Sequence, residues 1–234
     1  MTPQVTADAF ADLAEVLHAE PTPSRTAEEI VSFAQQELDA DYAGITLIRA
    51  RNKLETIAPT DPLVCQVDIL QYELDEGPCR DSSWHRQTLI SEDLASDDRW
   101  PQWAPKVVAI GIASALAVEL TGAEGRRLGA INLYWTERRQ FGSDDIAFAN
   151  LFARHAAIGL ANSMDLAGLN IALDGRKLIG QAQGILMERF DLDETRAFEV
   201  LRRYSQEHNL KLRRVAEHLI ETRRLPAPHD IGSG

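Results

Sequence analysis

The sequence has little that points to secretion, membrane insertion or covalent cross-linking. The N-terminus, MTPQVTADAF, lacks the basic start and apolar stretch of a signal peptide. The longest apolar run, VVAIGIASALAVEL, contains glycine and serine and ends at Glu119, so we interpret it as a helix end, a turn and a strand rather than a membrane span. The two cysteines, Cys65 and Cys79, form no metal or disulfide pattern. These absences predict a soluble, cytoplasmic protein without a metal site.

Catalytic patterns are missing as well. No Ser/His/Asp set, pair of carboxylates or phosphate-binding loop occurs at a meaningful spacing. The N-terminal half also lacks the alternation of strands and helices that a phospho-accepting receiver domain requires. We therefore expect no catalytic residues and a regulatory or binding protein rather than an enzyme. No cofactor is identified.

Acidic residues dominate the chain, whose 36 Asp and Glu against 24 Lys and Arg give a formal net charge of −12. Residues 176–225 are the exception, because eleven basic and eight acidic side chains give them +3 and leave −15 on the rest. Positive charge confined to one terminal segment favours an anionic partner there. An ordinary solvated surface would explain the same excess.

Apolar spacing and turn residues predict helices and strands that do not alternate regularly. This order favours an α+β fold, with an antiparallel sheet flanked by helices. Ser24 or Thr26 is placed to cap the second helix, and Pro101 and Gly111 to bound the fifth. The predicted helices are 6–19, 26–38, 61–72, a short one within 77–87, and 99–111; the predicted strands are 43–50, 53–58, 88–93, 114–120 and 126–135.

A long helix is predicted to start at Ser143, with Asp144 and Asp145 in its first turn. Residues at 3–4 spacing follow one stripe along it, and Asn162 on the stripe would fix the register of a coiled coil. Up to Ile158 we expect the stripe to pack on the sheet of its own domain, and from Leu166 to Leu173 against a partner helix in a homodimer. The stripe consists of Leu151, His155, Ile158, Asn162, Leu166, Leu169 and Leu173.

Four segments within 75–135, DEGPCRDS, SEDLASDDRWPQWA, GIASALAVEL and LGAINLYW, resemble a GAF domain. The resemblance covers about 7–161 and implies a module that senses a small molecule, light or redox state. A Trp, Arg and His grouping suits a planar or anionic ligand. Burial of Trp100 in a structural corner and of Cys79 in the core remain the favoured alternatives to direct roles. The candidate ligand-binding residues are Cys79, Trp84, His85, Asp97, Arg99, Trp100 and Trp103.

Three blocks in the basic segment, IGQAQGILMERF, DETRAFEVLRRYS and NLKLRRVAEHLI, resemble an ANTAR domain. The resemblance implies a unit of three short helices at 176–225, joined to the sensor by a linking helix at 162–175 and followed by a flexible tail at 226–234. Such a unit is expected to act as a dimer that binds paired RNA hairpins in a leader transcript and prevents a terminator from forming. The predicted core residues are Ala197, Phe198, Leu201, Leu212, Val215, Ala216 and Leu219.

Polar residues that remain outside this predicted core gather around the junction of the second and third helices. Lys and Arg would hold phosphates, and Tyr204 would stack on a base unless it is half-buried. The family pattern has Lys at the position of Gln183, so one phosphate contact is missing there. Gly184 lowers the stability of a helix, which indicates a close approach of another helix or a ligand nearby. The candidate RNA-binding residues are Arg176, Lys177, Gln183, Arg202, Arg203, Tyr204, Ser205, Gln206, Asn209, Lys211, Arg213 and Arg214.

Two other functions remain open. The last two helices could form a helix-turn-helix that binds DNA, although Glu217 and Glu221 would lie poorly beside phosphates. Alternatively, the basic segment only dimerises, and the chain is a ligand-binding module without nucleic-acid binding.

Overall fold

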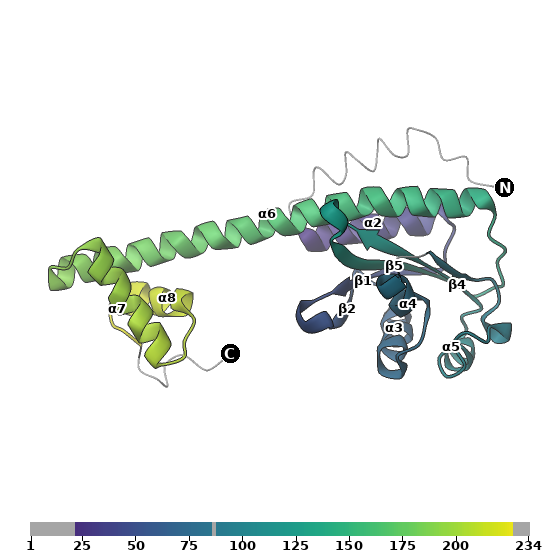
Figure 1. Cartoon of the computed structure of the whole chain (residues 1–234), viewed down its shortest axis with the longest axis horizontal. Helices are drawn as coiled ribbons and strands as arrows, with labels where there is room; N and C mark the ends of the chain where they lie inside the picture. The colour runs from purple at the N-terminus through teal and green to yellow at the C-terminus, as the bar shows by residue number, and fades with distance from the viewer. Residues whose placement is uncertain (1–21, 86–87, 227–234) are drawn as a thin grey trace. The chain divides into compact units, whose positions relative to one another are not determined.

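A computed structural model describes residues 22–85 and 88–226, except for the side chains of 83–85 (Figure 1). The predicted helix at 6–19 and nearly all of the predicted tail lie outside these residues. Contacts divide the chain into two units, Met1–Asp165 and Leu166–Gly234.

The first unit is built on one antiparallel sheet with strand order β2-β1-β5-β4-β3. This confirms the expected α+β class. The β1–β2 hairpin turns where predicted, with Arg51 and Asn52 both in the left-handed region that such tight turns require. The strands are β1 (Tyr42–Ile48), β2 (Leu54–Ile57), β3 (Leu89–Ser91), β4 (Ser114–Thr121) and β5 (Arg127–Trp135).

Helices cover both faces of the sheet (Figure 1). Helices α2 and α6 pack on one face, where Phe148 and Phe152 meet strand residues such as Leu116 and Leu133. The opposite face carries α3, α4 and α5 and encloses Trp100 and Trp103 among other residues. The helices of this unit are α2 (Pro23–Glu37), α3 (Pro62–Leu74), α4 (Pro78–His85), α5 (Ala104–Ile110) and the first part of α6 (Ser143–Phe190).

Two predicted helix starts are wrong. Helix α2 is capped by Thr22, whose Oγ1 accepts a hydrogen bond from the backbone N–H of Arg25, because Pro23 occupies the first helical position and needs no N–H partner. Helix α5 begins at Ala104, after a turn that contains Pro101. Its predicted end is confirmed, since Gly111 caps it in the left-handed region.

Gly129 of β5 lies where the backbone of the neighbouring strand leaves no room for a side chain. It has φ +152°, and a Cβ at this position would lie 1.7 Å from the carbonyl oxygen of Thr46 on the neighbouring β1 strand. The register between β4 and β5 shifts beside it, between Leu120 and Thr121. The glycine therefore lets β5 approach β1 closely, next to an irregular point in the ladder between β5 and β4.

Helix α6 packs on the sheet mainly through small side chains, and its large stripe residues face outwards. Leu151 and Ile158 are 46% and 53% exposed, so the expectation that they pack on the sheet is wrong. Phe148, Phe152 and a set of alanines cover the sheet instead. Past this point, in the second unit, the stripe continues with three leucines that are all more than half exposed: Leu166, Leu169 and Leu173.

By length and composition alone, α6 is the one helix of the described chain that could cross a membrane, contrary to the expectation that no segment is apolar enough. This is weak evidence, because a core helix of a soluble protein passes the same test.

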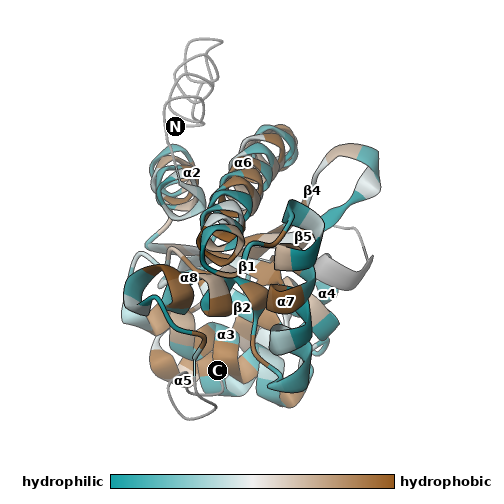
Figure 2. Cartoon of the chain, turned by 90° about the vertical axis from the view of Figure 1, so that its left-hand side faces the viewer, coloured by the Kyte–Doolittle hydropathy of each residue, from teal (hydrophilic) through white to brown (hydrophobic). Residues whose placement is uncertain are grey.

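The second unit packs the end of α6 against α7 (Glu194–Glu207) and α8 (Leu212–Thr222). Both of these helices mix apolar and polar residues along their length (Figure 2). The first of the three expected helices is not separate, because α6 runs unbroken from Ser143 to Phe190 and contains the predicted linking segment. The buried core consists of Ala182, Leu186, Ala197, Leu201, Val215, Ala216 and Leu219.

Candidate functional site

The α7–α8 junction brings several candidate RNA-binding residues together, but some of them build the turn itself. The hydroxyl of Ser205 donates to the carbonyl of Leu210, and Asn209 adopts a left-handed conformation with φ 52°. Tyr204 is half-buried and its ring lies 4.3 Å from that of His208. The side chains of Gln206 and Asn209 are exposed and form no hydrogen bond with the residues that the structure describes.

Gln183 also has a structural contact. Its Nε2 donates to the backbone carbonyl of Glu194 at 3.1 Å, which ties α6 to the first turn of α7. That first turn is capped as predicted by Asp193, whose carboxylate accepts from the backbone N–H of Arg196 at 2.7 Å. A lysine at position 183 would project a charge from the same place, whereas the glutamine is used within the unit.

The seven candidate Lys and Arg residues fall into two groups. Arg203 and Arg213 form ion pairs one helical turn along, with Glu207 at 2.7 Å and Glu217 at 2.8 Å. The hydrogen bond from Arg203 lowers the pKa of Glu207. The other five are exposed and form no ion pair with the residues that the structure describes, which leaves them available to phosphates: Arg176, Lys177, Arg202, Lys211 and Arg214.

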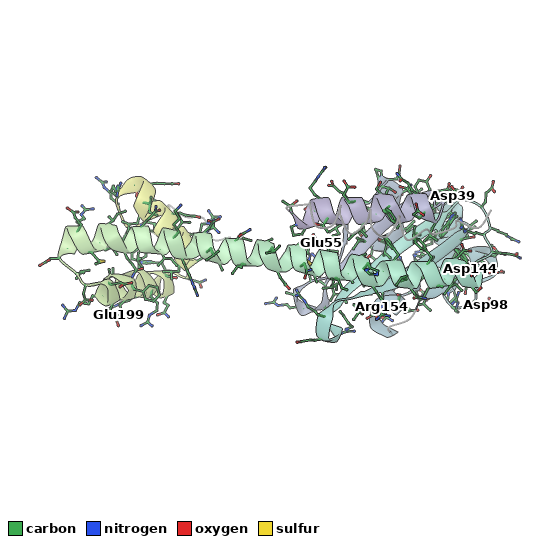
Figure 3. The ribbon with its side chains drawn as sticks, turned by 90° about the horizontal axis from the view of Figure 1, so that it is seen from above. Asp39, Glu55, Asp98, Asp144, Arg154 and Glu199 are labelled. Carbon is green, nitrogen blue, oxygen red and sulfur yellow. The ribbon has the colours of Figure 1, made fainter. Side chains whose placement is uncertain are left out.

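Acidic side chains share the surface of this unit. Glu199 projects from α7 away from the core (Figure 3). Phosphates are therefore expected to approach only where unpaired cations lie.

Two exposed aromatic rings were not anticipated. Phe198, predicted to lie in the core, is 36% exposed, and Phe190 at the end of α6 is 58% exposed. Phe198 lies one position away from the buried line formed by Ala197 and Leu201 at i and i+4. Helical periodicity could therefore have predicted that Phe198 is exposed. Either ring is more accessible to a base than expected for a core side chain.

A groove runs between the last turns of α6 and the end of α8. It has a volume of about 470 Å³. Beside the groove, the Arg189 side chain donates a hydrogen bond to the backbone carbonyl of Arg223 at 2.6 Å. The sequence predicted a special role for only one residue that lines the groove, Gly184. The lining residues come from two segments more than thirty residues apart, so no local pattern marks them. The lining consists of Gln181, Gly184, Ile185, Glu188, Ile220 and Arg223.

Three of the candidate ligand residues of the first unit lie in its core. Cys79 and Trp103 are fully buried and Trp100 is 2% exposed, which confirms the favoured core placement of Cys79 and Trp100. Arg99 lies outside, paired with Asp97 at 2.6 Å. Trp84 and His85 belong to α4, and their side chains lie outside the described part.

The interior of this unit instead contains a polar network centred on Asp68. This carboxylate of α3 is fully buried beneath the sheet, where its oxygens accept hydrogen bonds from four elements. The thiol of Cys79 joins the network by donating to Thr46 Oγ1 at 3.0 Å. The donors to Asp68 are Tyr134 Oη at 2.6 Å, Thr56 Oγ1 at 2.8 Å, Asn132 Nδ2 and Gln71 Nε2 at 3.3 Å, and Thr46 Oγ1 at 3.4 Å.

Two groups of this network have pKa values that burial raises. Burial raises the pKa of Asp68 to about 6, and the hydrogen bonds from Tyr134, Thr56, Asn132 and Thr46 limit that rise. Burial also raises the pKa of Tyr134 well above its usual value. Two further buried atoms, Asn132 Oδ1 and Ser82 Oγ, make no hydrogen bond within the described chain. These two buried atoms could therefore each form a further hydrogen bond.

Comparison with known families agrees with this division into a sheet unit and a helical unit. The GAF domain model matches residues 20–161, which is more than half of the chain, and the ANTAR domain model matches residues 167–220. The chain belongs to the GAF family and carries a C-terminal ANTAR domain. No curated protein among those compared matches the chain.

Solved structures share the fold of the GAF domain at low sequence identity. The GAF domain of a phosphoenolpyruvate-protein phosphotransferase from Coxiella burnetii has 14% identity and a TM-score of 0.55, over 69% of this chain and 95% of that one. The corresponding Acinetobacter domain has 12% identity and a TM-score of 0.54, over 69% and 96%. Free methionine-R-sulfoxide reductase from Neisseria meningitidis has 14% identity and a TM-score of 0.54, over 69% and 95%. These similarities concern the fold alone.

The domain pair indicates a regulator rather than an enzyme. A GAF domain is a sensory module and an ANTAR domain is an RNA-binding antitermination module, so the chain combines signal reception with RNA binding.

Proposed function

We propose that the protein is a dimeric, cytoplasmic antiterminator that binds paired hairpins in a leader transcript when its GAF domain receives a signal. The observation that carries this proposal is a set of five exposed cations on an ANTAR domain within an otherwise acidic chain, none of them paired with an acid in the part of the chain that the structure describes. Arg176, Lys177, Arg202, Lys211 and Arg214 would hold the phosphates of the RNA.

Replacing Arg202 and Lys211 together with alanine should weaken RNA binding. We expect affinity for a two-hairpin RNA to fall at least about tenfold at low salt, and the slope of log K against log salt to decrease by about 1.4 to 1.8, because each phosphate contact contributes about 0.7 to 0.9. Filter binding across a salt series, with RNA selected from a pool of tandem hairpins with randomised loops, measures both quantities.

The Arg203→Ala and Arg213→Ala double variant is the matched control. It removes the same formal charge, but these two cations already pair with Glu207 and Glu217. Its salt slope should change less. Duplex DNA of equal charge belongs in the same experiment, since tighter binding to it would support the helix-turn-helix alternative. A wild-type dimer that ignores the RNA pool at low salt while its helices remain folded would refute RNA binding.

The outward stripe of α6 supports the homodimer. Leu166, Leu169 and Leu173 lie on one side of the helix, at i, i+3 and i+7, and each is more than half exposed. Apolar residues at this spacing typically form the seam of a coiled coil. Asn162 is exposed on the same line, where a polar residue fixes register.

Leu166→Glu combined with Leu173→Glu is expected to convert the dimer to monomers, because charges on a coiled-coil seam oppose its association. Native mass spectrometry reports the oligomeric state together with any retained small molecule. Ile171→Glu is the control, since Ile171 is 61% exposed but lies on another side of the helix. Equal loss of the dimer in the control would place the interface elsewhere.

For the GAF domain we propose a ligand that is rich in hydrogen-bond donors or positively charged. The buried polar residues of the described chain include Asp68 but no Lys, Arg or His. An anion inside would face a carboxylate without a buried cation to offset it. This replaces the expectation of a planar or anionic ligand, which rested on Arg99 and two tryptophans.

A further inference from the structure

The groove between α6 and α8 presents three polar side chains without partners. Gln181, Glu188 and Arg223 all line it, and their side chains form no hydrogen bond or ion pair with any residue that the structure describes. Glu188 and Arg223 carry opposite charges on the same groove, yet they are not within ion-pair distance of each other. Their hydrogen-bonding groups are thus available to an occupant.

Gly184 lines the groove and places no side chain in it. A Cβ on this residue would meet nothing within 4 Å, so no internal contact demands glycine there. Glycine inside a helix destabilises it relative to alanine. The helix therefore carries a residue that lowers its own stability at a position that lines the groove.

We propose that this groove binds one unpaired nucleobase of the RNA, and that guanine fits it best. This proposal rests on the RNA-binding function proposed above and assigns a site for a base rather than for phosphate. Ile185 and Ile220 supply apolar contacts to the ring faces. The volume of about 470 Å³ is within the range of small-ligand pockets, about 300 to 1,000 Å³.

The charges of Glu188 and Arg223 favour binding of a base edge over a phosphate in the groove. The carboxylate of Glu188 repels phosphate but accepts hydrogen bonds from N1–H and N2–H₂ of a guanine whose Watson–Crick edge is unpaired. The guanidinium of Arg223 is suited to O6 and N7 of the same base. The amide of Gln181 can serve either edge. Adenine, cytosine and uracil each match only part of this set.

Gly184→Ala tests the proposal because it should improve the helix and obstruct the groove at once. We expect its Tm to rise by a few degrees, while its affinity for the RNA selected by the wild-type protein falls by about tenfold or more, the size of one lost bidentate base contact. Gly180→Ala is the matched control: its Cβ also meets nothing within 4 Å, but it does not line the groove. It should raise the Tm without weakening binding.

Photo-crosslinking then locates the base. RNA with 6-thioguanosine in the loops is irradiated with the full-length protein, and the crosslinked peptides should contain residues 181–188 or 220–223. Glu188→Gln should reduce the preference for guanine over adenine in the selected loop position.

The outcomes separate this proposal from the function on which it rests. If Gly184→Ala binds the RNA as tightly as the wild type, or if the crosslinks map outside the groove, the base site is wrong and RNA binding still stands. An equal loss in Gly180→Ala overturns the base site too. If the wild-type protein binds no RNA of the pool, both proposals fail.

Discussion

Gly129→Ala is expected to prevent the GAF domain from folding, or to destabilise it by more than about 4 kcal/mol, the range reserved for severe core disruptions. The added Cβ would lie 1.7 Å from the Thr46 carbonyl oxygen, 2.8 Å from the Thr46 carbonyl carbon and 3.0 Å from the Leu47 Cα. All three are backbone atoms of the adjacent strand, so no side chain can rotate away. Relief would require β1 and β5 to separate in the middle of the sheet.

Denaturant unfolding of the full chain, followed by circular dichroism, measures this effect. Gly111→Ala is the control because Gly111 also has a positive φ, +106°, but a Cβ there meets nothing within 4 Å. It should cost only about 1 kcal/mol, from backbone strain. Similar losses in the two variants would contradict the steric explanation.

Asp68→Asn should change how the stability of the GAF domain depends on pH. Burial raises the pKa of Asp68 from its ordinary value of 3.8 to about 6 in the folded protein. The folded state therefore holds the proton more tightly, and the resulting stability is fully present below about pH 4 and lost as pH rises through about 6. Two pKa units correspond to about 3 kcal/mol.

The quantity to measure is the difference in unfolding free energy between wild type and variant from pH 4 to pH 7, because the other carboxylates cancel in it. We expect the wild type to lose about 2.4 kcal/mol relative to Asp68→Asn over this range. The variant also presents an amide to donors such as Tyr134, so it should be less stable throughout. A constant difference would show that Asp68 titrates at its ordinary pKa.

Most of the sheet could be predicted because its signals are local. Apolar runs bounded by turn residues marked the strands, and the turn at Arg51 and Asn52 and the cap at Gly111 lie where the sequence places them. The packing of α6 could not be predicted in the same way. Its sheet-facing side is rich in small residues such as Ala153 and Ala156, which let helix and sheet approach closely, whereas the large leucines that dominate a periodicity argument face outwards.

The polar interior escaped prediction for a different reason. Asp68 looks like an ordinary acid in the helical segment PLVCQVDILQYEL, and all its hydrogen-bond donors except Gln71 come from β1, β2 and β5. Only the fold brings Thr46, Thr56 and Tyr134 around it. Trp100 and Trp103, by contrast, were predicted as candidate ligand-binding residues, but they lie in the core. Trp100 donates to Asp81 at 2.9 Å and Trp103 to the carbonyl of Val67 at 3.2 Å.

The strand order has a consequence for the synthesis of the chain. Strand β5 lies in the centre of the sheet, between β1 and β4, yet it is the last strand to leave the ribosome. At about 5 to 20 residues per second, the roughly 80 residues between β1 and β5 take about 4 to 16 seconds to translate. The nascent β1–β2 hairpin spends that time with one edge unpaired, where chaperones or neighbouring nascent chains have access to it.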